Sequence, residues 1–283
     1  MRIFGIAVMK NEADIVRPFL EHSRTWADRI FVYDNGSTDG TWQIVQEMAD
    51  DVIVPWKSED IPFHNNLRAR VFNAFRHEAT PGDWWCYRLD TDEFYIEDPR
   101  QFLSAVPAQY HTVYRKAINY RVAIEDAEQY PFTGDFAADR EFIRYFLPKG
   151  SVERRFIRHR ENLKWTEDGG TSYTGITYPQ MILARHYQWR SPQQIQTRLE
   201  SKRGYLLRKE EKKGRAERKA RVDSLYSAEN WRQLCPPRDR MILDTGPDSW
   251  SKIRWPDAKI KRVHENRFSY SLKRVLHFLR IVK

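Results

Sequence analysis

The sequence predicts an α/β fold in which helices cover both faces of a mostly parallel sheet, followed by a helical C-terminal extension. Through roughly the first hundred residues, short β-rich apolar runs alternate with stretches whose apolar residues recur at helical spacing. This alternation is typical of sheets whose parallel strands are joined by crossover helices. After residue 190 helical patterns dominate, and lysine and arginine accumulate there.

The expected elements follow one another along the chain. Strands are expected at residues 2–9, 29–33, 52–56 and 84–89, and helices at 14–26, 42–48 and 66–77. The loop 34–40 is rich in turn and N-cap residues, which favours a helix start directly after it. A longer strand is expected at 112–122, and an irregular, acidic and aromatic flap at 124–148. Ser191 and Pro192 form a good N-cap and first helical position, so a helix should begin there.

Polar clusters follow three of the predicted strands, at the point where each strand ends. The clusters are Lys10-Asn11-Glu12, Asp34-Asn35 and Asp90-Thr91-Asp92. One polar residue after a strand is ordinarily a turn or a cap. In open α/β sheets, however, ligands bind outside the carboxyl ends of the strands, so three clusters at one edge predict a binding site.

The composition favours a globular, cytoplasmic protein. Apolar residues make up 41% of the chain and charged residues 31%, which is unlike a disordered segment. Cys86 and Cys235 are the two cysteines, too few for a disulfide framework, which fits a reducing compartment. The apolar run 3–9 is too short for a signal segment, and no run of about 18 apolar residues predicts a membrane span.

The net charge of +9 is unevenly distributed along the chain. Residues 198–221 carry +7 and residues 252–283 carry +8, so the rest of the chain carries −6. Apolar residues recur at helical spacing in the second segment: Phe268, Leu272, Val275, Leu276 and Leu279. This pattern fits peripheral attachment to an anionic membrane surface. It fits equally a helix packed on the folded domain with its charges in water.

Asp90 and Asp92 are the sharpest chemical feature of the sequence. In an extended segment, side chains at positions i and i+2 project to the same side. Two carboxylates so placed need a counter-ion if both are to stay charged. Mn²⁺ or Mg²⁺ would supply it through oxygen ligands, with diphosphate oxygens at the remaining positions. The alternative is a solvated acidic turn, since Glu93 and Asp98 follow closely.

Three motifs stand in a fixed order along the first half of the chain. They read K-N-E at 10–12, D-N-G-S-T-D-G-T at 34–41 and L-D-T-D-E-F at 89–94. In this order they resemble the bacterial family 2 glycosyltransferases, which have the GT-A fold. The resemblance implies a Rossmann-like, mostly parallel mixed sheet and a catalytic domain over 1–190, followed by a basic helical extension over 191–283. Within that domain it implies a nucleotide-sugar half at 1–106 and an acceptor half at 107–190.

The same resemblance implies roles for residues that bind the donor. Glu12 and Asp34 match positions that contact the ribose or base of the nucleotide. Asp90 matches the first aspartate of the D-x-D motif, near the ribose and the metal. Arg68 and Arg70 lie where the family places a basic residue near the diphosphate. The A-R-N triplet that is common in the family is absent here, because Val71 follows Arg70.

Metal and base residues are implied in the same way. Asp92 matches the metal-binding aspartate, and His186 resembles a C-terminal histidine that related enzymes supply to the cation. An inverting transfer needs a carboxylate that removes the proton of the acceptor hydroxyl. In the segment T-E-D-G-G at 166–170, Asp168 is the first candidate for this base and Glu167 the second.

These features together predict a metal-dependent, inverting transfer of sugar from a nucleotide-diphosphate sugar to a glycan or lipid-linked acceptor. A nucleotidyltransferase, with a similar sheet, is one alternative. Such enzymes usually carry a Gly-rich, basic loop after the first strand, and residues 8–14 contain neither glycine nor arginine. A nucleic-acid-binding protein is the other, prompted by the pI of about 9.5. It is disfavoured because the basic residues lie in helical segments away from the sheet.

Overall fold

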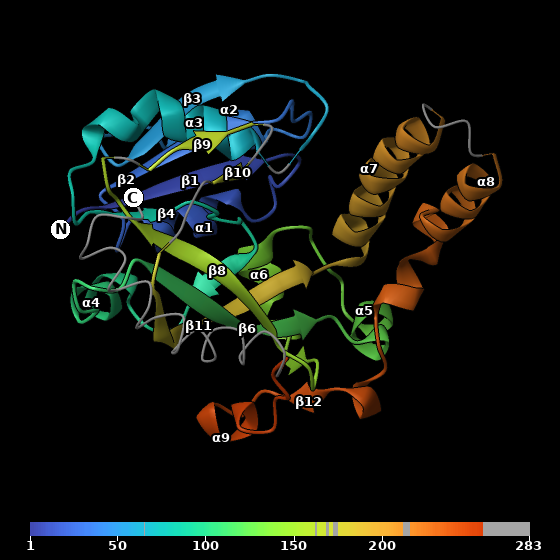
Figure 1. Cartoon of the computed structure of the whole chain (residues 1–283). Coiled ribbons are helices and arrows are strands. Elements are labelled where there is room, and N and C mark those ends of the chain that lie inside the picture. The colour runs from blue at the N-terminus through green and yellow to red at the C-terminus, as the bar shows by residue number, and fades with distance from the viewer. Residues whose placement is uncertain (65, 162, 168–169, 172–174, 212–215, 257–283) are drawn as a thin grey trace. The chain divides into compact units, whose positions relative to one another are not determined.

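The computed structural model describes residues 1–64, 66–161, 163–167, 170–171, 175–211 and 216–256 (Figure 1). The chain divides into two compact units. The first comprises Met1–Ala117, Gly150–Arg185 and the residues from Trp255, and the second comprises Ile118–Lys149 and His186–Arg254. Strands β6 (Thr112–Arg121) and β11 (Thr177–Trp189) begin in the first unit and end in the second.

Parallel strands form the centre of the first unit. Their order is β4 (Trp84–Cys86), β1 (Ile3–Met9), β2 (Arg29–Asp34) and β3 (Ile53–Ser58). Beyond β4 the sheet continues with antiparallel partners, β8 (Ser151–Arg158) and then β6. Strand β5 (Glu93–Tyr95) pairs with β11. The predicted α/β class with a mixed sheet is therefore confirmed.

Helices cover both faces of this parallel sheet, so both sets of alternating side chains on its strands are apolar. On one face, Ile3 and Ala7 of β1 belong to a buried cluster with residues of α1 (Val16–Ser23) and α2 (Thr41–Glu47). On the other face, Phe4 and Ile6 belong to a cluster with residues of α3 (Leu67–Phe75). The remaining helix and strands of this unit are α4 (Pro99–Ser104), β9 (Trp165–Thr166) and β10 (Gly170–Thr171).

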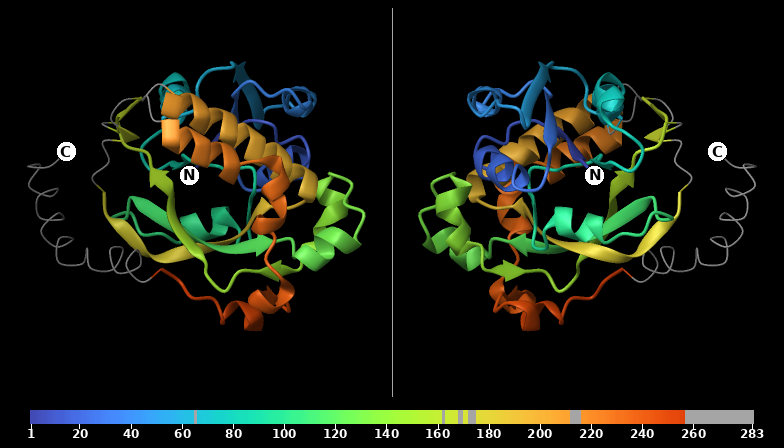
Figure 2. Two further views of the ribbon diagram at one scale, coloured as in Figure 1. Left: turned by 90° about the vertical axis from the view of Figure 1, so that its right-hand side faces the viewer. Right: turned by 90° about the vertical axis from the view of Figure 1, so that its left-hand side faces the viewer.

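The second unit contains several short strands and helices and one pair of longer helices. β7 (Tyr145–Phe146) lies between β6 and β12 (Ile242–Leu243). α7 (Pro192–Glu211) and α8 (Ala216–Leu225) pack against each other, as both views in Figure 2 show. Ser191 Oγ accepts a hydrogen bond from Gln194 N at 3.1 Å, which confirms the predicted helix start. The other helices are α5 (Ile124–Gln129), α6 (Phe136–Asp139) and α9 (Pro247–Trp250).

The prediction of an irregular flap at 124–148 is wrong. This segment contains α5, α6 and β7, and its aromatic residues Phe132, Phe136 and Phe146 are buried. The aromatic side chains that suggested a surface flap therefore form part of the core of the second unit. Among the described residues, no helix combines the length and the apolar character needed to cross a membrane.

Three further expectations had different outcomes. Strand β4 ends at Cys86 rather than Leu89, although Leu89 N still donates to Ile6 O of β1 at 3.0 Å. The apolar stripe from Phe268 to Leu279 lies outside the described residues. The division into domains at residue 190 stays a prediction.

Candidate active site

The loops that follow β1 and β2 are tied together by the side chains of their motifs. Asn11 N donates to Ser37 Oγ at 2.9 Å, and Thr38 N donates to Asn11 Oδ1 at 2.9 Å. Glu12 N donates to Thr41 Oγ1, also at 2.9 Å. Asn11 has a φ of 53°, a left-handed conformation that asparagine tolerates better than most residues. These bonds hold Glu12 at the carboxyl edge of the parallel strands.

Asp34, at the end of β2, accepts hydrogen bonds at the same edge of the sheet. Its side chain is fully buried, and its Oδ2 accepts hydrogen bonds from Ser37 N at 3.0 Å and Ser58 Oγ at 2.6 Å. Asn35 Nδ2 donates to the carbonyl of Ile61 at 2.8 Å, and a Cβ on Gly36 would lie 2.7 Å from the Cα of Asp60. The D-N-G-S-T-D-G-T motif therefore joins the loops after β1, β2 and β3. The nucleotide-binding roles of Glu12 and Asp34 stay predictions.

The segment that carries Asp90 and Asp92 is a turn, not the extended strand that the sequence suggested. Glu93 N donates to Asp90 O at 3.2 Å, and β5 begins at Glu93. Leu89 N donates to Ile6 O at 3.0 Å, which holds the start of the turn beside β1. Because of the turn, the carboxylates of Asp90 and Asp92 meet different neighbours.

The counter-charge for Asp90 comes from arginines. Arg68 donates to Asp90 Oδ1 at 2.9 Å, while Arg88 and Arg155 each donate to Oδ2 at 3.1 Å. Burial lowers the pKa of Arg68, and the charge of Asp90 opposes that shift. Arg68, which the sequence placed near a diphosphate, therefore holds Asp90 in this structure.

Glu93 is clamped by two arginines in the interior of the first unit. Arg155 Nε lies 2.9 Å and Arg115 Nε 3.0 Å from Glu93 Oε2, and both guanidiniums also donate to Oε1. All three side chains are at most 2% exposed. Burial lowers the pKa of Arg155, but the charges of Glu93 and Asp90 outweigh it and raise this pKa well above its usual value. Arg155 thus links both ends of the turn.

The sequence reasoning gave no role to Glu93, although a signal for it was present. Arg115 alternates with Val113 and Ala117 on one face of β6, and both of these apolar neighbours are buried. An arginine on a buried face needs a buried carboxylate as its partner. The carboxylate beside the D-x-D motif was therefore a candidate before the fold was known.

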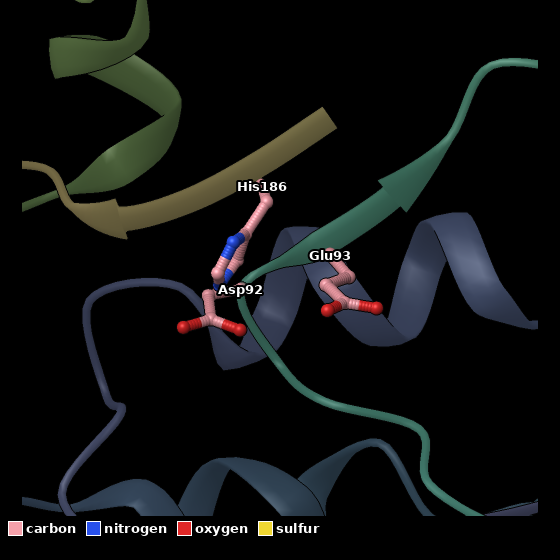
Figure 3. Close-up of side chains that lie close together, drawn as sticks. All are labelled: Asp92, Glu93 and His186. Atoms are coloured by element: carbon pink, nitrogen blue, oxygen red, sulfur yellow. The ribbon is translucent and has the colours of Figure 1, made fainter. Parts of the chain in front are cut away.

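Asp92 and His186, two of the predicted metal ligands, lie close together. One ligand atom each from Asp92, Glu93 and His186 falls within 4.8 Å of the other two (Figure 3). Strand β11 reaches His186 three residues after Leu183, whose carbonyl accepts a hydrogen bond from Ile96 N at 2.9 Å. A buried carboxylate beside an imidazole fits Mn²⁺, and less closely Mg²⁺. Both oxygens of Glu93 are engaged by guanidiniums, so Asp92 and His186 fit a cation better than Glu93 does.

Glu167, the second candidate base, lies against α3. Its Oε2 accepts a hydrogen bond from Arg70 Nε at 2.8 Å, and His64 Nε2 is 3.8 Å from the same oxygen. This hydrogen bond raises the pKa of Arg70. Asn73 Nδ2 donates to Trp165 O at 2.8 Å, which fixes the neighbouring backbone of β9 to the same helix. Asp168, the first candidate, lies outside the described residues.

In open α/β sheets, ligands bind outside the carboxyl ends of the strands, which is where the three motif loops of this chain lie. Residues 6–103 match the family model "Glycosyl transferase family 2". Over this segment, about a third of the 283-residue chain, the sequence is similar to family 2 glycosyltransferases. No curated protein matches the chain.

A solved structure similar to this chain is described as a "Putative Glucose-1-Phosphate Thymidylyltransferase from Bacillus anthracis" in complex with a sucrose. The two sequences are 10% identical, and the TM-score is 0.29. The match covers 44% of this chain and 57% of that one, so this chain spans less than two thirds of its length.

We expect Glu93→Gln to lower the free energy of unfolding by on the order of 3 kcal/mol, because it leaves two buried guanidiniums without their full counter-charge. Denaturant unfolding followed by tryptophan fluorescence measures this loss. The matched control is Glu47→Gln, which removes the exposed partner of Arg17 and should change the same quantity by less than about 1 kcal/mol. Equal effects of the two substitutions would contradict the structural role of Glu93.

Proposed function

We propose that the chain transfers a sugar from a nucleotide-diphosphate sugar to a hydroxyl of a glycan or lipid-linked acceptor, as in polysaccharide assembly. One observation carries this proposal. Within the family 2 segment, the motif loops after β1, β2 and β4 all lie at the carboxyl edge of the parallel strands. That edge is where open α/β sheets bind nucleotides. Glu12 and Asp34 are our candidates to contact the nucleoside.

The two arginines proposed to face the diphosphate differ in what they can reach. Arg68 is buried and bonded to Asp90, so it would act on the donor through the placement of that carboxylate. Arg70 has a 37% exposed side chain, so an anion can approach it from solvent. A guanidinium suits phosphate because its planar fork matches two oxygens at once. We therefore favour Arg70 as the direct diphosphate contact.

Asp92 and His186 are the residues that would hold Mn²⁺ or Mg²⁺. When bound, such a cation neutralises negative charge on the leaving diphosphate. Such a cation would add positive charge beside the turn, in which Asp90 and Glu93 have arginine partners. Asp92 would then direct its carboxylate to the cation, while Asp90 stays with its guanidiniums.

The proposed displacement is inverting, with a carboxylate that accepts the proton of the acceptor hydroxyl. Glu167 could serve, but its Oε2 is already engaged by Arg70, so that oxygen must release Arg70 to take the proton. This engagement favours the neighbouring Asp168 as the base. Glu167, which directly follows β9, lies beside α3, the helix that carries both arginines.

Asp92→Asn should abolish the Mn²⁺-dependent part of nucleotide binding and leave the fold intact, because the amide keeps the shape of the side chain but loses its charge. The measurement is calorimetric titration of UDP, GDP and dTDP with and without Mn²⁺. Asp51→Asn, at an exposed position, is the matched control and should bind as the unsubstituted chain does. Metal-dependent binding that survives Asp92→Asn would refute this assignment.

Asp168→Asn should lower turnover at least 100-fold while donor affinity changes little, because general-base catalysis contributes about 10²–10⁴ and the base acts on the acceptor. Steady-state kinetics and donor titration on the same preparation separate the two effects. If Glu167→Gln alone gives this signature, the roles are exchanged. If neither substitution does, the base lies on another segment.

We also propose that the enzyme works at an anionic membrane surface, on the inner face of the cytoplasmic membrane. The support is charge: residues 198–221, within α7 and α8 and the link between them, carry +7. Arg218, Lys219 and Arg221 are exposed on α8. Each basic residue near such a surface contributes about 1 kcal/mol, so a few suffice for reversible attachment. Nucleic acid is not a proposed partner.

The triple substitution Arg218→Glu, Lys219→Glu and Arg221→Glu should abolish cosedimentation of the full chain with phosphatidylserine vesicles at low salt. High salt should release the unsubstituted chain as well, because the Debye length falls to about 3 Å at 1 M. The same change of charge at exposed Arg17, Arg24 and Lys57 is the control and should leave sedimentation unaltered. Failure of the unsubstituted chain to sediment would end the proposal, and so would an equal loss in the control.

A further inference from the structure

In the second unit, the side chains of His186 and Asn119 are joined by a hydrogen bond. His186 Nδ1 lies 3.0 Å from Asn119 Oδ1. His186 is on β11 and Asn119 is on β6, and these two strands are paired. Asn119 belongs to none of the three sequence motifs, so its position beside a candidate metal ligand was not foreseen.

The orientation of the Asn119 amide is fixed from its other side. Asn119 Nδ2 donates to the carbonyl of Lys149 at 2.9 Å, and the backbone carbonyl of Asn119 accepts from Leu147 N at 2.9 Å. A carbonyl can only accept, so the NH₂ group must face Lys149 and Oδ1 must face the imidazole. The backbone bond to Leu147 keeps the strand, and with it the amide, in register.

An oxygen acceptor at Nδ1 determines which ring nitrogen carries the proton. Oδ1 of an amide has no hydrogen to give, so Nδ1 must be the donor in the neutral imidazole. The second nitrogen, Nε2, then carries the lone pair. A histidine binds a cation through its unprotonated nitrogen, and the hydrogen bond at the other nitrogen sets which one that is.

We infer that Asn119 is a positioning residue that holds His186 in the tautomer with the proton on Nδ1, which makes Nε2 the nitrogen that meets a cation. The inference rests on the proposed function only in taking His186 as a metal ligand. The position of the proton itself follows from contacts inside the second unit. Loss of a partner of this kind typically lowers metal affinity by about 10–100-fold.

The tautomer can be observed in the full chain without any metal. The spectra are recorded with ¹⁵N-labelled histidine at about pH 8.5. Two-bond ¹H–¹⁵N correlation spectra distinguish a protonated nitrogen from one with a lone pair, and His186→Gln identifies its signals. We expect Nδ1 to be the protonated nitrogen of His186. In Asn119→Leu this preference should be lost, and in Asn119→Asp, which keeps an acceptor oxygen, it should remain.

Mn²⁺ alone is the probe for the second readout, measured by calorimetry. Asn119→Leu should weaken Mn²⁺ binding about 10–100-fold, whereas Asn119→Asp should retain it. Asn230→Leu is the matched control, because Asn230 Nδ2 also donates to a backbone carbonyl in the same unit, that of Ser224. This control should change neither the spectrum of His186 nor the affinity for Mn²⁺.

The outcomes separate this inference from the function on which it rests. A proton on Nε2 in the unsubstituted chain overturns the inference, and so does a tautomer that Asn119→Leu leaves unchanged, however tightly Mn²⁺ binds. If the tautomer is as expected but His186→Gln binds Mn²⁺ like the unsubstituted chain, the proposed metal site is refuted and the ligand role of His186 with it. Loss of the tautomer together with the expected fall in affinity supports both.

Discussion

The candidate site depends on the bonds that the guanidinium of Arg155 makes with two carboxylates. This guanidinium joins Asp90 and Glu93, the first and last residues of the turn that carries the D-x-D motif. Placing so many charges out of water is costly unless each finds a partner with good geometry. Here strand β8 brings Arg155, strand β6 brings Arg115 and helix α3 brings Arg68. The turn therefore has its conformation only when all three elements are folded around it.

The acidic residues of the motif differ in the contacts that they make. Asp90 and Glu93 are neutralised by the protein itself, and their charges are used to hold the turn together. Asp92 lies between them in the sequence, and one of its carboxylate oxygens lies within 4.8 Å of a ring nitrogen of His186. A divalent cation is attracted by carboxylate charge, but it is also repelled by nearby guanidiniums. Arg68 and Arg155 donate to Asp90, and Arg115 and Arg155 donate to Glu93, so these guanidiniums contact the residues on either side of Asp92.

The sequence predicted the parallel half of the fold well, because that half is governed by local patterns. The apolar runs ending at Met9 and Asp34 became strands, and the motif after each run lies at the expected edge. Partners contributed by distant strands could not be predicted in this way. The alternation of side chains along β6 placed Arg115 on a buried face, where it needs a carboxylate partner. That partner, Glu93, lies 22 residues away in sequence. The turn at Asp90 was not predicted for the same reason, because Arg68, Arg115 and Arg155, which hold it, come from other elements.

The loop that joins β2 to α2 has a consequence for how a ligand would be received. Asn11, Asp34 and Ser37 form hydrogen bonds within and between these loops, and Gly36 allows the chain to approach Asp60 closely. Fixing a residue's backbone costs about 1–2 kcal/mol of conformational entropy, and here that loss occurs when the protein folds. A small molecule arriving at this edge meets a surface that is already ordered, so little of its binding energy is diverted to immobilising the protein.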